Sequence, residues 1–346
     1  MLKKLLFLSF VTCCFHLTKA QQAEQHLKNL KQLTFGGDNA EAYWSFDNKK
    51  ISFQSNNKAW GLHCDQIFMM DLAHTDTAVH PKMISTGLGR TTCSFYMPDN
   101  KHILYASTHL GNKDCPAEPP HTGRYLWAVY ADFDIFIATE AGKITKQLTN
   151  QKGYDAEATV SPKGDKIVFT STRNGDLDLY TMDIDGKNVK QITFELGYDG
   201  GAFFSPDGKK LVFRASRMKT EEEKKDYIEL LAKGLVAPTN MEIYTCNIDG
   251  SDMKQITNLG KANWAPFYHP LGKKIIFSSN HHSTKGYDFQ LFMINVDGSG
   301  LERITNESLF NAFPMFSPDG KKLIFSSNRN NGGTRDTNLF MAEWAE

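Results

Sequence analysis

The sequence is poor in three features that would each indicate a definite class of protein: excess charge, long hydrophobic runs and cysteine. Its 39 Lys and Arg residues balance its 39 Asp and Glu residues, so the formal net charge is zero. The basic residues are spread along the chain, which argues against a nucleic-acid-binding surface. After the first 20 residues no run is apolar enough to cross a membrane. We therefore expect no nucleic-acid partner and no transmembrane segment.

The first 20 residues have the composition of an export signal. Lys3 and Lys4 precede an apolar run at residues 5–17, and the segment ends in the small residue Ala20, as a signal peptidase requires. The run is too short to span a bilayer, which needs about 20 residues. We expect cleavage near Ala20 and export of residues 21–346 to the periplasm or out of the cell.

The six cysteines are too few for a disulfide-stabilised scaffold in 346 residues. Two of them, Cys13 and Cys14, lie in the expected leader and leave a lipid-anchored form open as an alternative. Export allows one disulfide among the others. The pairing Cys93–Cys115 is expected, and Cys64–Cys115 competes with it.

Motifs of several enzyme classes are also missing. The sequence has no HExxH zinc motif, no G-x-S-x-G nucleophile elbow and no glycine-rich phosphate loop after a strand. The phrase D-I-D-G at residues 183–186 resembles the start of a calcium loop, but the glutamate at the twelfth position is missing. It recurs as N-I-D-G and N-V-D-G in equivalent places, so we interpret it as a turn. These absences favour a protein that is not an enzyme.

The sequence does contain an internal repeat. A phrase of the type K-Q-(L/I)-T recurs at residues 30–34, 81–85, 145–149, 189–193, 253–257 and 301–305. A turn phrase such as S-P-D-G-K-K follows each copy, in which Pro presets φ and Gly supplies φ > 0. Two short apolar strands come after every turn. Because four short strands repeated in this way are typical of a propeller blade, we predict an all-β, six-bladed β-propeller of four-stranded antiparallel blades in a single domain, residues 21–346.

The two ends of the chain predict how the ring closes. The chain begins with the outer-strand phrase L-K-Q-L-T and ends on the third-strand phrase N-L-F-M-A-E-W, which lacks an outer strand of its own. An open sheet edge would invite aggregation. We therefore expect the N-terminal strand to complete the last blade.

The phrases S-P-D-G-K-K-L-V-F-R-A-S, D-L-Y-T-M-D-I-D-G and K-Q-I-T resemble the WD-repeat-like, PD-repeat propeller of the TolB type. The resemblance covers roughly residues 27–346 and only the propeller part of a TolB protein, which carries a separate α/β domain before its propeller. It implies the propeller fold and an accessory role in envelope transport. Similar propellers also stand beside peptidase domains and occur in sugar-cleaving lyases, so the fold alone does not fix the function.

Strand order predicts that one face of the propeller carries all the variable loops. Turns between first and second strands, and between third and fourth, are short and uniform and share the other face. The variable face carries an aromatic-rich insertion at residues 108–134, with Tyr125, Trp127 and Tyr130, and a second insertion at residues 217–240. Variable loops on a rigid scaffold are where binding usually occurs, so we expect the ligand on this face.

The second insertion, in blade 4, is expected to contain a helix. Thr220 can cap its start with Glu223 three residues on, and Gly234 can end it. Tyr227, Leu230 and Leu231 form an apolar stripe at helical spacing. The stripe predicts that the helix packs on the propeller rim, with a lid or a partner-binding role as the alternative.

Candidate ligand-binding residues occur at the starts of the inner strands and in the loops after the second strands. Because six inner strands converge on one axis, these side chains could surround a single polar pocket. They are Glu41, Arg90, His109, Asp155, Glu157, Arg173, Asp199, Arg217, Trp264, His281, His282 and Arg329. A carboxylate pair can act as general acid and base, which makes Asp155, Glu157, Asp199 and His281 the candidates for catalysis.

Other readings of these residues stay open. A carboxylate that faces Arg173 or Arg217 could form a structural ion pair instead. His281 and His282 are the candidates for a divalent metal ion, although adjacent side chains rarely point the same way and no spaced ligand set accompanies them. Glu157 stands out because the equivalent positions in later blades hold glycine, alanine and phenylalanine, so the fold does not require a carboxylate there.

Two functions are carried forward. The leading hypothesis is an exported, monomeric propeller scaffold that binds a protein, peptide or glycan on its long-loop face. The alternative is a hydrolase or lyase acting on an oligosaccharide or peptide, with a carboxylate and histidine site at the mouth of the channel.

Overall fold

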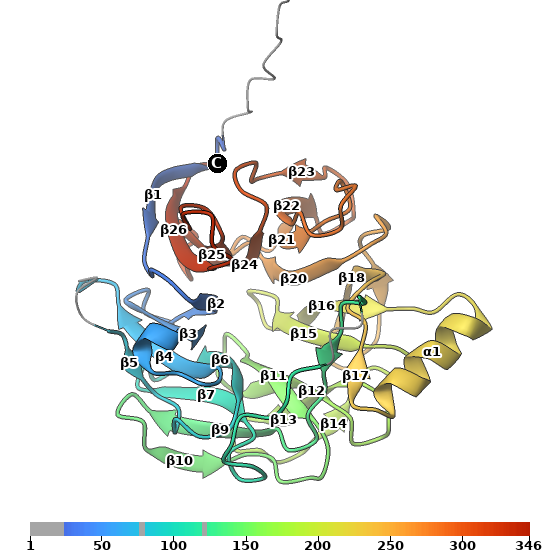
Figure 1. Cartoon of the computed structure of the whole chain (residues 1–346). Coiled ribbons are helices and arrows are strands. Elements are labelled where there is room, and N and C mark those ends of the chain that lie inside the picture. Colours follow the sequence, from blue (N-terminus) through green and yellow to red (C-terminus); the bar gives the residue numbers. More distant parts are fainter. Residues whose placement is uncertain (1–23, 76–79, 120–122) are drawn as a thin grey trace, which may run out of the picture.

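The structure, a computed structural model, describes residues 24–75, 80–119 and 123–346. Six four-stranded antiparallel sheets stand around a common centre (Figure 1). The predicted six-bladed propeller is therefore confirmed. The predicted leader, residues 1–20, lies outside the described residues.

Each blade runs from an inner strand at the axis to an outer strand at the rim. The inner strands are β2 (Asp38–Trp44), β6 (Thr91–Tyr96), β11 (Asp155–Val160), β15 (Asp199–Phe204), β20 (Asn263–Tyr268) and β24 (Asn311–Phe316). The second strands are β3 (Lys50–Asn56), β7 (His102–Ser107), β12 (Lys166–Ser171), β16 (Lys210–Ser216), β21 (Lys274–Ser279) and β25 (Lys322–Ser327). The third strands are β4 (Gln66–Asp71), β9 (Asp134–Thr139), β13 (Asp178–Asp183), β18 (Met241–Asn247), β22 (Gln290–Asn295) and β26 (Asn338–Trp344). The outer strands are β5 (Lys82–Met83), β10 (Ile144–Gln147), β14 (Lys190–Gln191), β19 (Lys254–Gln255), β23 (Glu302–Arg303) and, for the last blade, β1 (Leu27–Gln32).

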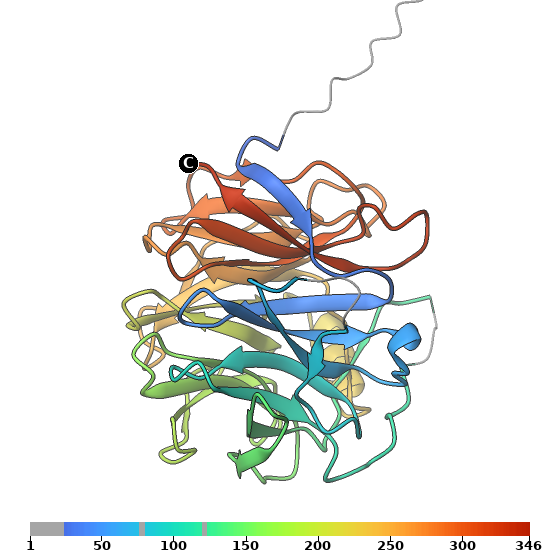
Figure 2. The same cartoon turned by 90° about the vertical axis from the view of Figure 1, so that its left-hand side faces the viewer.

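The N-terminal strand closes the ring, as the sequence predicts. β1 pairs antiparallel with β26, and the two lie side by side in both views (Figures 1 and 2). The residues before β1 add to this closure. The carboxylate of Glu24 accepts two hydrogen bonds from the guanidinium of Arg329, at 3.0 and 3.2 Å, and the ring of His26 stacks on Trp344. Residues 24–32 and the C-terminal strand β26 thus both belong to the last blade.

Each second strand has an aromatic residue at the same position. The six residues at this position are completely buried: Phe53, Tyr105, Phe169, Phe213, Phe277 and Phe325. Each is in register with an aromatic side chain of the third strand of its blade, as in the Phe325–Phe340 pair, whose ring centroids are 6.1 Å apart. Buried aromatic pairs contribute both area and a preferred geometry. The short apolar strands that follow each turn phrase therefore form part of the core of each blade.

Two insertions on the long-loop face meet each other. The first contributes β8 (Trp127–Ala128) and the second contributes β17 (Leu235–Val236), and the two short strands pair antiparallel. The backbone N–H of Val129 also donates to the carbonyl oxygen of Gly234 at 2.7 Å. The loops of blades 2 and 4, about a hundred residues apart in sequence, are therefore one connected layer.

The predicted helix is confirmed as α1 (Glu221–Leu231), with the capping box between Thr220 and Glu223 in place. The side chain of Tyr227 is buried, and its hydroxyl donates a hydrogen bond to Asp176 of blade 3 at 2.5 Å. The helix therefore packs on the propeller rim. With 11 residues it is much shorter than a bilayer-spanning helix, and no helix among the described residues is long and apolar enough to cross a membrane.

The expected Cys93–Cys115 disulfide is wrong. Cys115 is bonded to Cys64 instead, with a Cα–Cα distance of 5.5 Å, and Cys93 is free. The reason is the position of Cys93 within β6, where its thiol donates to the carboxylate of Glu41 in the neighbouring blade. The bond that does form ties the insertion of blade 2 to a loop of blade 1.

Candidate functional site

Every inner strand contains a bulge, and the bulge is at the same place in each blade. The residue at this place has a positive φ, between 46° and 59°. A bulge bends the strand and redirects a side chain. The six equivalent residues line a single cavity at the axis of the propeller: Glu41, Cys93, Glu157, Gly201, Ala265 and Phe313.

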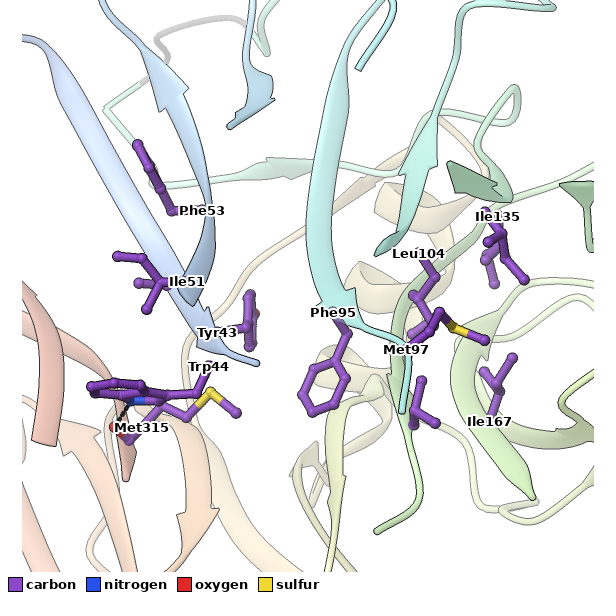
Figure 3. Close-up of a cluster of buried hydrophobic side chains, with 14 of the residues drawn as sticks. Tyr43, Trp44, Ile51, Phe53, Phe95, Met97, Leu104, Ile135, Ile167 and Met315 are labelled. Carbon is purple, nitrogen blue, oxygen red and sulfur yellow. Dashed lines mark hydrogen bonds between the residues drawn. The ribbon is translucent and has the colours of Figure 1, made fainter. Parts of the chain in front are cut away.

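A second ring of equivalent residues closes the cavity on one side. Two positions further along the inner strands stand Tyr43, Phe95, Thr159, Phe203, Phe267 and Met315. Tyr43 contacts both Phe95 and Phe203, with ring centroids 5.7 and 6.0 Å away, and Figure 3 shows Tyr43 and Phe95 facing each other from neighbouring inner strands. Beyond this ring lies a smaller cavity of about 200 Å³ at the face of the short turns. The central cavity, about 540 Å³, is therefore closed on the side of the short turns by this second ring, in which four of the six side chains are aromatic.

The upper wall of the cavity comes from the two insertions. Tyr125, Trp127 and Tyr130 of the first insertion and Val236 of the second line it. The indole of Trp127 contacts that of Trp264, with ring centroids 5.0 Å apart. A ligand would therefore enter from the long-loop face, beside these aromatic rings.

Glu157 is the carboxylate with the most hydrogen bonds in the cavity. It accepts from the hydroxyl of Tyr198 at 2.6 Å, from the hydroxyl of Thr170 at 2.8 Å, from the backbone N–H of Gly201 at 2.8 Å, and from the guanidinium of Arg214. Burial opposes ionisation, but the charge of Arg214 and the hydroxyl donors outweigh it and hold the pKa of Glu157 below its usual value. The two carboxylate oxygens each accept two hydrogen bonds, so Glu157 is ionised and fully bonded.

The guanidinium of Arg214 can take its position only because residue 201 is glycine. Its guanidinium lies over the rings of Trp127 and Tyr198, 5.3 and 4.9 Å from the centroids. A Cβ on Gly201 would come within 1.9 Å of Nη1 of Arg214, so any other residue at 201 would displace the guanidinium. Arg214 was not among the candidate residues expected from the sequence. The available signal was the charge inside the phrase L-V-F-R-A-S, since the other second strands hold Gln54, Ala106, Thr170, Ser278 and Ser326 at this position.

Glu41 is the second carboxylate among the six bulge residues that line the cavity. Its Oε2 accepts hydrogen bonds from the hydroxyl of Tyr43 at 3.0 Å and from the thiol of Cys93 at 3.1 Å. Burial raises the pKa of Glu41, and the negative charge of Glu157 adds to this, although the two hydrogen bonds act in the opposite direction. Glu41 and Glu157 therefore have pKa values shifted in opposite directions within one cavity.

Of the twelve candidate ligand-binding residues, four line the cavity: Glu41, Arg90, Glu157 and Trp264. The others lie outside its lining, and several are bonded within their own blades. Asp155 accepts from Arg173 at 3.0 Å and Asp199 accepts from Arg217 at 2.5 Å. Burial raises the pKa of Asp199 to about 7 in spite of Arg217. The structure thus separates Asp155 from Glu157, two residues that the sequence places together.

The residues after the second strands share one arrangement. Nδ1 of His109 lies 2.9 Å from the hydroxyl of Ser107, Nδ1 of His281 lies 2.8 Å from that of Ser279, and Nε of Arg173 donates to Ser171 at 2.9 Å. Arg329 bonds to Ser327 in the same way, at 3.1 Å. These side chains also stack on an aromatic ring of their own blade, as His109 does on Phe136 and Arg329 on Phe325. The repetition in four blades indicates a structural role for this position.

The two adjacent histidines diverge. The rings of His281 and His282 are at 80° to each other, and Nε2 of His282 is 3.4 Å from a carboxylate oxygen of Asp288. Neither histidine lines the central cavity. Within residues 24–75, 80–119 and 123–346, no group of three or more His, Cys, Asp or Glu side chains is placed to hold a metal ion.

Comparisons with known proteins agree with this architecture. The family model of the TolB β-propeller domain, PD40, matches residues 111–229 and 228–340. Among solved structures, a protein of Agrobacterium tumefaciens assigned as TolB is 20% identical, with a TM-score of 0.58, and the match covers 90% of this chain and 91% of that chain. TolB from Acinetobacter baumannii is 20% identical with the same TM-score, and the match covers 87% of this chain and 65% of the TolB chain.

An oligogalacturonate lyase in complex with manganese is 14% identical with a TM-score of 0.51, and the match covers 92% of this chain and 93% of the lyase. At these identities the solved structures show a shared fold. No curated protein sequence matches. Since the matches to the family model extend over more than half of the sequence, the chain belongs to the TolB β-propeller domain family.

Proposed function

We propose that this chain is an exported binding protein that takes part of a protein, peptide or glycan ligand into its central cavity. The observation that carries the proposal is the form of the cavity. Its volume of about 540 Å³ is within the range of about 300–1,000 Å³ typical of ligand pockets. It is closed at one end by the ring that includes Tyr43 and Phe203, and its open end is walled by aromatic side chains of the long loops.

Aromatic walls suit both kinds of ligand named here. The rings of Trp127 and Trp264 present large apolar faces beside the polar groups of Tyr125 and Tyr130. Such side chains combine apolar contact with a hydrogen-bonding end, which fits an extended peptide or a sugar ring. The enclosed floor limits the ligand to a side chain, a chain end or one or two sugar units.

A hydrolase or lyase is the alternative, and one observation favours it. Glu41 and Glu157 share the cavity with pKa values moved apart by their surroundings, which is the arrangement of an acid and a base in many enzymes. However, Glu157 is bonded to Arg214 and to three other donors, so it cannot take up a proton without breaking a buried ion pair. Glu41 therefore lacks a second carboxyl group that could exchange a proton in the same reaction. Binding is the better supported function.

Export is part of the proposal. The leader composition supports it, and so does the Cys64–Cys115 disulfide, because such bonds persist in oxidising compartments. The TolB propeller likeness further suggests an accessory role in envelope transport. We also propose that the protein acts as a monomer.

The proposal is tested by screening purified protein, residues 21–346, against arrays of short peptides and oligosaccharides, with affinities measured by calorimetry. Trp127→Ala should weaken the best ligand at least tenfold because the indole forms part of the cavity wall. Trp60→Ala is the matched control, since Trp60 is also half-buried but packs on Phe68 outside the cavity lining. Equal affinity in both variants would contradict the cavity as the binding site. Turnover of a peptide or oligosaccharide that Glu41→Gln abolishes would favour the enzyme.

A further inference from the structure

The charges that line the central cavity do not balance. Five carboxylates and three guanidinium groups line it: Asp38, Glu41, Asp65, Glu118 and Glu157, and Arg90, Arg124 and Arg214. An unbalanced, partly buried charge is costly unless a partner compensates it. The lining thus holds two more carboxyl groups than guanidinium groups.

Each of the three guanidinium groups already forms an ion pair within the protein. Arg214 is bonded to Glu157, and Arg90 is bonded to Asp65 at 2.9 Å and to Glu118. Arg124 makes a two-point ion pair, at 2.5 and 2.7 Å, with Asp226 of α1, which is not part of the lining. Two carboxylates of the lining form no ion pair with a described cation. They are Glu41, at the bulge of β2, and Asp38, which is exposed.

One acceptor atom in the lining of blade 1 has no donor. Both hydrogen bonds to Glu41 end on Oε2, so Oε1 accepts none from any described residue. Oε1 is not among the fully buried, unpartnered atoms of the described residues, so it is open to the cavity that Glu41 lines. An accessible carboxylate oxygen without a donor favours a ligand with N–H groups.

The protein itself shows how this cavity holds a cation. In blade 4 the guanidinium of Arg214 lies over the rings of Trp127 and Tyr198 and pairs with Glu157. Blade 1 differs from blade 4 at two positions: β3 holds Gln54 where β16 holds Arg214, and β2 holds Glu41 where β15 holds Gly201. Blade 1 therefore offers a carboxylate to the cavity and has no cation at the position of Arg214. Aromatic faces together with a carboxylate are the usual surroundings of an organic cation.

We propose that the ligand carries an organic cation, a primary ammonium or a guanidinium, which binds the carboxylate of Glu41. This inference rests on the proposed function and names the chemistry of the ligand. The cation favours the ionised form of Glu41, which burial disfavours, and supplies the donor that Oε1 lacks. The groups that face Glu41 are Tyr43 on its own strand, Cys93 on β6, and Glu157 and Arg214 further round the cavity, and among these only Arg214 is cationic.

The test uses three peptides that differ at one position, N-acetyl-Ala-X-Ala-amide with X as lysine, norleucine or glutamate, and free n-butylamine as the isolated cation. Affinities are measured by the fluorescence of the cavity tryptophans. The lysine peptide should bind at least ten times more tightly than the norleucine peptide, and Glu41→Gln should remove this difference. Glu229→Gln is the control, because Glu229 is an exposed carboxylate on α1, and it should leave the difference unchanged.

Several outcomes would overturn the inference. They are equal binding of the lysine and norleucine peptides, tightest binding of the glutamate peptide, and binding by none of the probes. The first two leave the proposed function intact, since a neutral or acidic ligand still occupies the cavity. Competition by n-butylamine would show that the cation alone is recognised, whereas a lysine preference without such competition would show that the peptide backbone contributes. The melting temperature of Glu41→Gln, compared with that of the unchanged protein, separates lost binding from lost folding.

Discussion

The hydroxyl of Tyr198 donates to the carboxylate of Glu157 at 2.6 Å across the junction between blades 3 and 4. The guanidinium of Arg214 bonds to both groups, and it is 2.7 Å from the tyrosine oxygen. Three strands, β11, β15 and β16, are joined at this point inside the cavity. The same contacts therefore stabilise the propeller and shape the proposed binding site.

Glu157→Gln should destabilise the protein by about 3–5 kcal/mol, because it leaves the charge of Arg214 buried without its partner. The free energy of unfolding in urea measures this. The double variant Glu157→Gln with Arg214→Met should recover part of the loss, since it removes the unpaired charge. A single variant as stable as the unchanged protein would show that the pair contributes nothing.

The same pair predicts a dependence on acid pH. The pKa of Glu157 is lowered in the folded chain, so its contribution to stability is present above the unfolded value of about 4.3 and is lost as the pH falls through the folded value. The unfolding free energy should therefore fall more between pH 5 and pH 3 in the unchanged protein than in Glu157→Gln. Parallel curves for the two proteins would contradict this account.

Asp199 predicts the opposite pH dependence. Burial raises its pKa to about 7, so the folded chain keeps a proton that the unfolded chain releases near pH 4. The contribution of this carboxyl to stability is complete below pH 4 and is lost as the pH rises to about 7. The melting temperature should therefore drop between pH 5 and pH 8 by more in the unchanged protein than in Asp199→Asn. Equal drops would show that Arg217 keeps Asp199 ionised throughout.

Arg173→Ala should reduce stability by about 3 kcal/mol, because the buried carboxylate of Asp155 loses its partner. Its affinity for a cavity ligand should stay within twofold, since neither residue lines the cavity. Arg335→Ala, at an exposed position, serves as control for both measurements. A tenfold loss of affinity in a folded Arg173→Ala protein would show that this blade contact belongs to the binding site.

The Cys64–Cys115 bond links residues 51 apart in sequence, so its removal should cost about 2–4 kcal/mol. Cys115→Ser should therefore melt at a lower temperature than the unchanged protein under oxidising conditions, and the two should melt alike once the bond is reduced in both. Cys93→Ser, which removes a free thiol, should keep the bond. Peptide mapping without reduction that finds Cys93 in a disulfide would contradict the pairing.

The fold was predictable because the sequence repeats one phrase in every blade. The short apolar strands, the turn phrases and the missing outer strand at the C-terminus can each be recognised from a few neighbouring residues. Together they predict the number of blades and the closure through β1. The helix was predictable for the same reason, since its capping box is a local signal at Thr220 and Glu223.

The site could be predicted only in part, and the pair Asp155 and Glu157 shows why. Residues two apart in a regular strand point the same way, so the sequence suggested a pair of neighbouring carboxylates. The bulge in β11 lies between Ala156 and Thr159 and separates them: Asp155 bonds to Arg173 in its own blade, and Glu157 lines the cavity. A bulge has no reliable sequence signal when the residue with positive φ is not glycine, and here that holds in five of the six blades. The contribution of Arg214 also depends on Gly201, a partner from another strand.

The central claim is that the ligand occupies the cavity, and the most direct test is to fill that cavity without disturbing the fold. Ala265 and Phe313 occupy equivalent positions with similar backbone angles, φ 47° and 54°, so the backbone at 265 can carry a phenylalanine. Ala265→Phe should bind the best ligand of the peptide and oligosaccharide screen at least tenfold more weakly, with an unchanged melting temperature, while Ala141→Phe in the exposed turn between β9 and β10 should bind normally. Full binding by a folded Ala265→Phe protein would contradict the claim.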